Sequence, residues 1–206
     1  MSGFGQTPGH AAVMELKSEQ AVFREAYVFL DEKRLLLATE LIRQLRLYQQ
    51  LERELDVLHT QAREAMQAAV MHHGLDGLQV YPAASFDGAD FSHSARNFMG
   101  VTLLETSMSS DESADGQTAP ANPSGIAQQC IRLLQDCIEQ SAVLAGMSGN
   151  LYRLLAEYRT TERRSRALEN VILPEMEQRL REITSHLNEL DLEDAIRVHL
   201  QSRRQE

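Results

Sequence analysis

The chain has 206 residues, of which 30 are acidic and 20 basic, and its formal net charge of −10 argues against a nucleic-acid binder with a broad basic face. Apolar residues make up 43%, too many for a disordered polymer, whereas aromatic residues make up only 5%, too few for a large globular core. This combination favours long helices around a narrow apolar seam. The sequence contains no run of 18 apolar residues, so we expect no transmembrane helix and no direct membrane insertion.

The N-terminal third predicts one long helix. Residues 1–11 contain Gly, Ser and Pro and are expected to be frayed, whereas residues 12–73 contain neither Gly nor Pro. Within this stretch the seam positions follow one another in steps of four and three, the 3.5-residue repeat of a left-handed coiled coil. The predicted seam consists of Leu16, Gln20, Phe23, Tyr27, Leu30, Arg34, Leu37, Leu41, Gln44, Tyr48, Leu51, Leu55, Leu58, Ala62, Ala65 and Ala69. At 1.5 Å per residue the helix would be roughly 90 Å long.

Two polar residues on this seam allow two interpretations. Arg34 and Gln44 could fix the register of the coiled coil as buried polar groups. Alternatively, their stems could lie along the edge of the seam while the polar ends reach water. The sequence leaves both possibilities open.

The middle segment, 74–125, has a different composition. We expect His72-His73-Gly74 to end the first helix, with the histidines favoured there by the helix dipole. The stretch Leu78 to Tyr81 predicts a short strand, and Phe98 to Leu104 predicts its partner in a short β-hairpin. Residues 107–125 are rich in Ser, Asp, Ala, Pro and Gly and predict a loop.

A second long helix is predicted over 126–206. Gly146 and Gly149 lower helix propensity by up to about 1 kcal/mol each, but the seam continues through them. A small phase change is expected near Pro174, which removes one backbone hydrogen bond and should bend the helix. The predicted seam consists of Cys130, Leu134, Cys137, Ser141, Leu144, Ser148, Leu151, Leu155, Tyr158, Glu162, Ser165, Leu168, Ile172, Leu180, Ile183, Leu187 and Leu190.

The connection between the helices favours an antiparallel coiled coil, so the fold class is mainly α with a small β-hairpin. The tip of the longer second helix, from about Thr184, should then extend past the N-terminus without a partner. Cys130 and Cys137 are interpreted as reduced core residues, because seven residues on one helix separate them by about 10 Å.

The sequence offers little chemistry. Asp56 and His59 have a spacing used in di-metal helical bundles, but the second copy of the motif is missing, so packing is favoured over metal binding. His72-His73 could also bind metal, although a helix end explains the pair more simply. We therefore expect no catalytic residue, no cofactor and no metal.

Several segments resemble the D subunit of V-type (A/V-type) rotary ATPases. The Arg-rich stretch Arg163 to Arg166 is followed by Ala-Leu-Glu-Asn, an apolar pair and Pro174, as in that family's C-terminal helix. The stretch Leu192 to Val198 is similar to the family's acidic, apolar and Arg-containing ending. Leu-Asp-Glu-Lys-Arg from Leu30 and the step Met99-Gly100-Val101 match its N-terminal element and its apolar-Gly-apolar strand in the same order.

The resemblance implies a non-catalytic central rotor shaft on the cytoplasmic face of a membrane-bound ATP synthase or ATPase. Such a shaft transmits torque between ATP synthesis or hydrolysis in the head and proton or sodium transport. Its implied partners are the A and B subunits of the head, the small F subunit of the central stalk and a connecting subunit of the membrane rotor. The implied contacts with the head ring are Arg163, Arg166, Leu168, Glu169, Ile172, Leu187, Leu190 and Ile196, and those with the small partner are Leu78, Val80, Tyr81, Val101 and Leu103.

Two other classes remain open from the residues alone. The first is another coiled-coil stalk or adaptor, such as a stalk component of a flagellar export ATPase, which would lack the Ala-Leu-Glu element followed by Pro. The second is a helical-bundle metalloenzyme, which requires ligand motifs on four helices.

Overall fold

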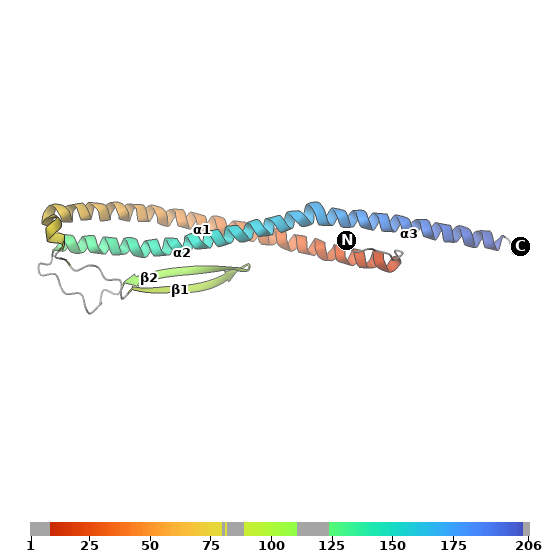
Figure 1. The fold of residues 1–206 in the computed structure, drawn as a ribbon, viewed down its shortest axis with the longest axis horizontal. Coiled ribbons are helices and arrows are strands. Elements are labelled where there is room, and N and C mark those ends of the chain that lie inside the picture. Colours follow the sequence, from red (N-terminus) through yellow and green to blue (C-terminus); the bar gives the residue numbers. More distant parts are fainter. Residues whose placement is uncertain (1–8, 80, 82–88, 111–123, 204–206) are drawn as a thin grey trace. The chain divides into compact units, whose positions relative to one another are not determined.

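The structure, a computed structural model, describes residues 9–79, 81, 89–110 and 124–203. It divides into two compact units, one formed by the chain up to Leu36 and from Tyr158 onward, the other by Leu37–Glu157. In chain order, the elements are α1 (His10–Gln79), β1 (Ala89–Phe98), β2 (Val101–Ser110), α2 (Gly125–Ala167), the π-helical turn η1 (Leu168–Ile172) and α3 (Leu173–Ser202) (Figure 1). The prediction of a mainly helical chain with a β-hairpin in its middle is therefore confirmed. Among the described residues, no helix has both the length and the apolar character needed to cross a bilayer.

The seam predicted for α1 is confirmed along its whole length. Every one of its positions is buried or half-buried, including the two that carry polar side chains. Gln44 is only 8% exposed and donates from Nε2 to Glu40 Oε1 at 3.0 Å, so it belongs to a buried polar cluster. Arg34 instead pairs with Asp31 of its own helix at 2.6 Å and stays half-exposed, as expected for a side chain at the seam edge.

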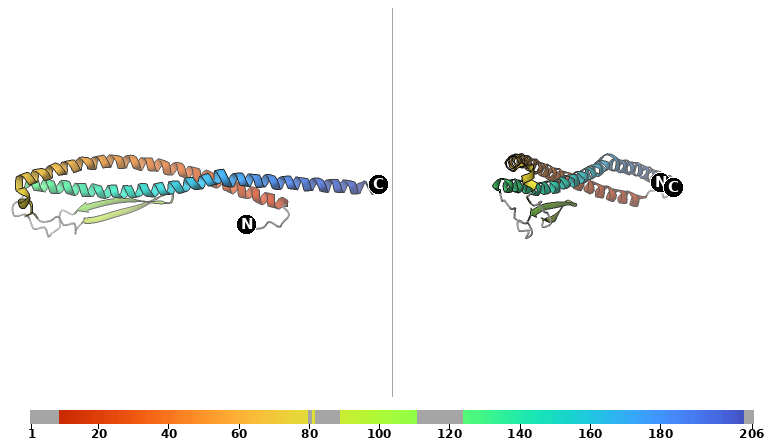
Figure 2. Two further views of the ribbon diagram at one scale, coloured as in Figure 1. Left: turned by 45° about the horizontal axis from the view of Figure 1, so that its top comes forward. Right: turned by 60° about the vertical axis from the view of Figure 1, so that its left-hand side comes forward.

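Within the Leu37–Glu157 unit, α1 and α2 pair in antiparallel directions. Met66 Sδ lies 3.7 Å from Cys130 Sγ, and His73 Nε2 lies 2.7 Å from Ser124 Oγ. Residue numbers therefore rise along α1 as they fall along α2, and the two helices lie side by side in both views (Figures 1 and 2). The antiparallel arrangement predicted from the short connection is confirmed here.

The other unit also has an antiparallel helix pair. Arg24 Nη2 donates to Glu177 Oε1 at 2.9 Å, and His10 Nε2 lies 3.7 Å from Asp191 Oδ2. All described residues from Asn188 onward are exposed. The stretch without a helical partner thus begins near residue 192 rather than near Thr184, because the first turn of α1 still reaches Asp191.

The expected phase change near Pro174 takes the form of a π-helical turn. In η1 the Leu173 N–H donates to the Leu168 carbonyl, five residues back, and Pro174 follows in the first turn of α3. The wider turn shifts the helix face relative to an uninterrupted α-helix. As a result Met176 is buried, a position that the 4-3 spacing passed over.

The hairpin is present, but its predicted boundaries are wrong. Leu78 lies in the last turn of α1, beyond Gly74, where a φ of 68° interrupts the helix, and Val80 lies outside the described residues. The strands are ten residues each, and β2 extends through Ser110, where a loop was expected. Phe98 and Val101 pair across a two-residue turn in which Met99 and Gly100 both have positive φ, as the right-handed strand twist requires. The predicted strand at 98–104 therefore contains this turn.

Candidate partner-binding surfaces

One edge of the hairpin is held by α2. Leu104 faces Ala95 in a pair that does not exchange hydrogen bonds, so its backbone N–H and C=O point away from β1. Asn150 of α2 satisfies both groups, accepting from the Leu104 N–H at 2.8 Å and donating to the Leu104 carbonyl at 2.7 Å. Asn150 is only 4% exposed, and its amide makes the two hydrogen bonds that a neighbouring strand would otherwise make with Leu104. The ribbon views show the hairpin lying along α2 (Figure 2).

A glycine one turn earlier allows the close approach of strand and helix. The Thr106 hydroxyl donates to the Ala142 carbonyl at 3.0 Å. A Cβ atom on Gly146 would lie 2.1 Å from Thr106 Oγ1 and 2.9 Å from its Cγ2, distances that no real side chain tolerates. Ala142, Gly146 and Asn150 are four residues apart and form one docking stripe on α2. In the sequence Gly146 stood out only as a weak helix former, although this small-residue spacing was visible.

A buried carboxylate connects the hairpin to α1. Glu40 is 8% exposed and accepts two hydrogen bonds from the Arg43 guanidinium, at 2.8 and 2.6 Å. Arg96 of β1 reaches the same carboxylate at 3.3 Å. The hydrogen bonds from Arg43, followed by that from Gln44, lower the pKa of Glu40 from 4.5 to about 2 despite its burial, so the group stays ionised at neutral pH.

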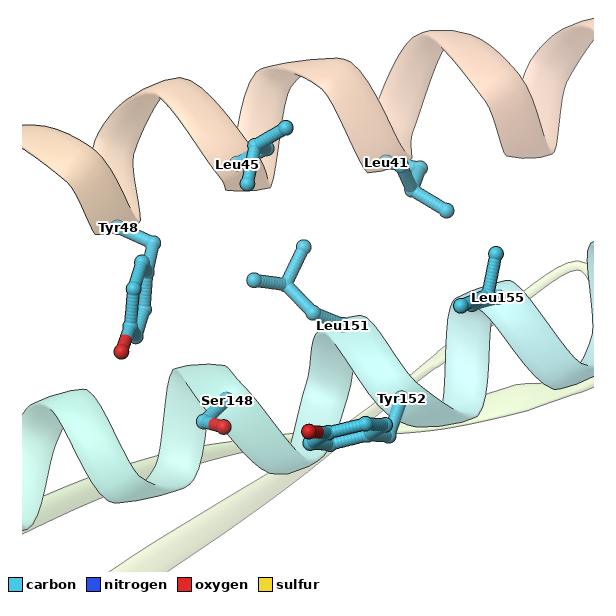
Figure 3. Close-up of a pocket in the computed structure, with 7 residues that line it drawn as sticks. All are labelled: Leu41, Leu45, Tyr48, Ser148, Leu151, Tyr152 and Leu155. Atoms are coloured by element: carbon cyan, nitrogen blue, oxygen red, sulfur yellow. The ribbon is translucent and has the colours of Figure 1, made fainter.

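Between α1 and α2 the seam leaves a cavity of about 300 Å³ (Figure 3). Its lining residues are Leu41, Leu45, Tyr48, Ser148, Leu151, Tyr152 and Leu155. The expectation that Ser148 faces larger residues of the opposite helix fits this arrangement. Its lining is mainly apolar, the hydroxyls of Tyr48, Ser148 and Tyr152 are its polar groups, and it contains no carboxylate, histidine or cysteine. We therefore assign no reaction to it.

A wider groove lies nearer the turn between the helices. It has a volume of about 810 Å³, and most of its lining comes from α1. Met66, Met71 and Leu134 contribute exposed apolar surface to it, with 46, 80 and 44% of each residue accessible. Leu134 was predicted to be a seam residue, but it lies at the border of this groove.

The residues expected to contact the small partner fall into two groups. Val101 and Leu103 are 5% and 2% exposed, so their side chains belong to the interior of this unit. Leu78 and Tyr81 lie near the turn, where the Tyr81 N–H donates to the Leu78 carbonyl at 3.1 Å and both remain half-buried. Of these two regions, the groove offers accessible apolar surface and the inner face of the hairpin does not.

The residues expected to contact the head ring are also divided. Leu168 and Leu187 are buried within their unit, and Ile172 is half-buried. Arg163 and Ile196 are exposed, and Leu190 is just above one-third exposed. These two groups differ in role, because only the exposed side chains can contact a partner without rearrangement.

The other two residues expected at the head ring also lie on the surface. Arg166 is exposed and donates to Glu162 at 2.7 Å on its own helix. The negative charge of the exposed Glu169 carboxylate is the largest cause of the raised pKa of Tyr27 on α1, and the Tyr27 hydroxyl also donates a hydrogen bond to this carboxylate. This contact ties η1 to α1 within the unit.

The two cysteines are free and buried, as expected. Burial raises the pKa of both thiols, so neither is a ready thiolate nucleophile. Among the described residues, no group of three or more His, Cys, Asp or Glu side chains is placed to hold a metal.

The chain is similar to known proteins over most of its length. The family model for the D subunit of ATP synthase matches residues 12–201. The D subunit of the V-type ATP synthase of Thermotoga neapolitana is 23% identical over 93% of this chain and 94% of its own length. The D subunit of the A-type ATP synthase of Thermococcus gammatolerans is 25% identical over 93% of this chain and 90% of its own length. The match extends over nearly the whole chain, including both long helices and the hairpin, and the chain therefore belongs to the family of ATP synthase D subunits.

Proposed function

We propose that this chain is the central rotor shaft of a V-type or A-type ATP synthase or ATPase, and that it carries torque rather than catalysing a reaction. The observation that carries the proposal is the family match over residues 12–201, which includes both antiparallel helix pairs. The shaft would couple ATP synthesis or hydrolysis in the A and B subunits of the head to proton or sodium transport by the membrane rotor. Its place would be the cytoplasmic face of the membrane.

The packing suits a part that must resist twisting. Two helices joined along an apolar seam cannot rotate independently without breaking side-chain contacts. Asn150 and Glu40 add polar contacts that hold the hairpin to α2 and α1, respectively. Buried hydrogen-bonded groups of this kind have strict geometry, which favours stiffness over sliding.

We further propose that the apolar groove around Met66, Met71 and Leu134 contacts the small F subunit of the central stalk. Its exposed methionines support this assignment, because flexible apolar side chains adapt to a partner surface. Replacing Met66 and Met71 with Ser should weaken that contact, whereas the same change at Val57, an exposed residue outside the groove, should not.

Affinity isolation of the tagged chain from native membranes tests the main proposal. We expect the catalytic and non-catalytic head subunits, the small stalk subunit and a membrane-rotor component to be recovered together. In a rotation assay with the head fixed, a bead attached to the hairpin should turn during ATP hydrolysis. Recovery of the chain without any ATPase subunit would refute the proposal.

A further inference from the structure

The apolar seam of the second helix changes register by one residue at η1. Before this turn the inward positions follow in steps of four and three, and Thr161, Ser165 and Leu168 are buried. Continuing these steps from the half-buried Ile172 would turn a set of charged or titratable residues inward, namely Glu175, Arg179, Glu182, His186 and Glu189. All of these are exposed, and the residues that turn inward lie one place later, namely Met176, Leu180, Ile183 and Leu187. The turn η1 therefore absorbs one inserted residue.

The neighbouring helix α1 has no matching irregularity. Residues 11–73 contain no Gly, no Pro and no positive φ, so α1 keeps its regular period opposite η1. If η1 became α-helical with every residue present, α3 would turn by about 100° around its axis, the angle of one residue. That rotation would press Glu175, Arg179 and Glu182 against α1, and burying such charges is costly. The π turn therefore cannot convert to α-helix while the extra residue is there.

The backbone of η1 has few hydrogen bonds of its own. Leu173 donates to the Leu168 carbonyl, but Pro174 has no N–H. The carbonyl of Asn170, four residues before the proline, and that of Glu169, five before it, therefore receive no bond from this position. Both residues are exposed, so water reaches this side of the turn. Local opening of a helix costs least where its backbone bonds are few and accessible to solvent.

Two contacts with α1 hold the turn. The Tyr27 hydroxyl donates to the Glu169 carboxylate, which lies within η1. Arg24 Nη2 donates to Glu177 Oε1 at 2.9 Å, and Glu177 follows directly after the buried Met176. Both contacts need the register that the π turn provides, because a shift by one residue would carry each carboxylate to another side of its helix.

We propose that η1 is a hinge created by one inserted residue, and that Tyr27 is the positioning residue that holds it closed through Glu169. The hinge opens by local loss of the π turn rather than by conversion to α-helix, since conversion would bury the charged residues of α3. π-helical turns often occur at functional sites, and an interrupted backbone ladder is a common cause of helix bending. The Glu169 side chain thus acts within the chain, in addition to any contact with a partner.

The hinge has a consequence for a rotating shaft, and this consequence rests on the proposed function. Twist that reaches this part of the chain is taken up first where the fewest backbone bonds resist it. The apolar seam on either side of η1 keeps its packing meanwhile. A single extra residue thereby determines where the shaft yields.

Deleting Asn170 tests the origin of the hinge. The deletion removes the inserted residue and keeps Pro174, so the steps of four and three continue from Leu168 through Leu173 and Met176. We expect an α-helical segment whose amides, from 168 to 173, exchange about two- to tenfold more slowly, the effect of about one net hydrogen bond. The midpoint of urea unfolding should be equal or higher.

Deleting Arg164 provides the matched control. It removes one exposed residue of the same helix but places Arg166 and Glu169 at the seam positions of Ser165 and Leu168. The urea midpoint should therefore fall. A midpoint for the Asn170 deletion as low as that of this control would overturn the proposal, because the residue removed would then not be the inserted one.

Replacing Tyr27 with Phe tests the positioning role. The ring remains and the bond to Glu169 is lost, so the amides of η1 should exchange about two- to tenfold faster. Tyr152→Phe, at an exposed position of the other unit, should leave them unchanged. In the chain without Asn170, Tyr27→Phe should have no effect on this segment. Equal acceleration in both chains would mean that Tyr27 does not act through the hinge.

The pKa of Tyr27 provides a readout that packing alone would not move. The negative charge of Glu169 is the largest cause of its raised pKa. In Glu169→Ala and in Glu169→Gln, titration of labelled Tyr27 by NMR should show a lower pKa. Only the Ala variant should speed exchange in η1, because Gln retains an acceptor for the hydroxyl. An unchanged pKa of Tyr27 in both variants would refute the contact.

A rotation assay tests the consequence for the shaft. With the head fixed, a bead on the hairpin should show a narrower spread of angles for the chain without Asn170 than for the unmodified chain. An equal spread would refute η1 as the place that yields, although the chain can still be a shaft. If neither chain turns during ATP hydrolysis, the proposed function itself fails, whereas the exchange and unfolding results judge the hinge independently.

Discussion

Replacing Gly146 with Ala should destabilise the chain, although Ala is the better helix former. Helix propensity favours Ala by up to about 1 kcal/mol. Against this, the new Cβ would meet Thr106 Oγ1 at 2.1 Å and the Thr106 Cβ at 3.0 Å, so the hairpin must move away from α2. Overpacking of this kind costs about 1–3 kcal/mol. We therefore expect a net loss of up to about 2 kcal/mol after the propensity gain is subtracted.

Gly149, three residues further along the same helix, provides a matched control. A Cβ there would meet only the Arg153 guanidinium, at 3.9 Å, so Gly149→Ala should stabilise by up to about 1 kcal/mol. Urea unfolding followed by circular dichroism measures both changes, and hydrogen exchange at the Leu104 amide reports whether the hairpin has left Asn150.

A second substitution tests the cause. In a Thr106→Ala background, the Gly146→Ala penalty should shrink, because the two closest atoms are gone. Equal changes in stability, in the same direction, for Gly146→Ala and Gly149→Ala would refute the reasoning. The close approach of β2 to α2 would then not determine the cost of adding a Cβ at position 146.

Three further outcomes follow from the structure. Asn150→Ala should cost about 1–3 kcal/mol in urea unfolding, because the outward N–H and C=O of Leu104 lose their partner; an unchanged midpoint would contradict this. The pKa of Glu40 is lowered, so its contribution to stability is present above pH 4.5 and is lost as the pH falls toward about 2; Glu40→Gln should flatten that part of the pH profile, and an identical profile would argue against it. Amides from 192 to 203 should exchange fast in the free chain and become protected in an assembled head. Equal protection in both states would show that this end of α3 does not contact the head.

Much of the helical architecture was visible in the sequence. The 4-3 spacing from Leu16 to Ala69 predicted which residues of α1 turn inward, and none of them is exposed. This works because the side chains of a helix repeat at a period set by local backbone geometry, so the buried face is encoded within a few consecutive residues. The sequence also predicted a phase change near Pro174, but it did not predict that this change takes the form of a π-helical turn.

The strand boundaries could not be derived in the same way. The apolar run from Leu78 continues α1 beyond Gly74, while β1 consists mostly of small and polar residues that carry no alternating apolar pattern. Short apolar runs fit a helix end and a strand equally well, and neighbours in space decide between them.

The contacts that position the hairpin were decided only by the tertiary structure. Asn150 and Leu104 are 46 residues apart, and Glu40 and Arg96 are 56 apart, so no local period links them. Position 146 must be glycine only because Thr106 lies against it and would clash with any Cβ atom. The sequence by itself therefore determined the two long helices and their seams, because these follow from local periodicity. The docking of the hairpin depends on which surfaces meet once the chain has folded back on itself.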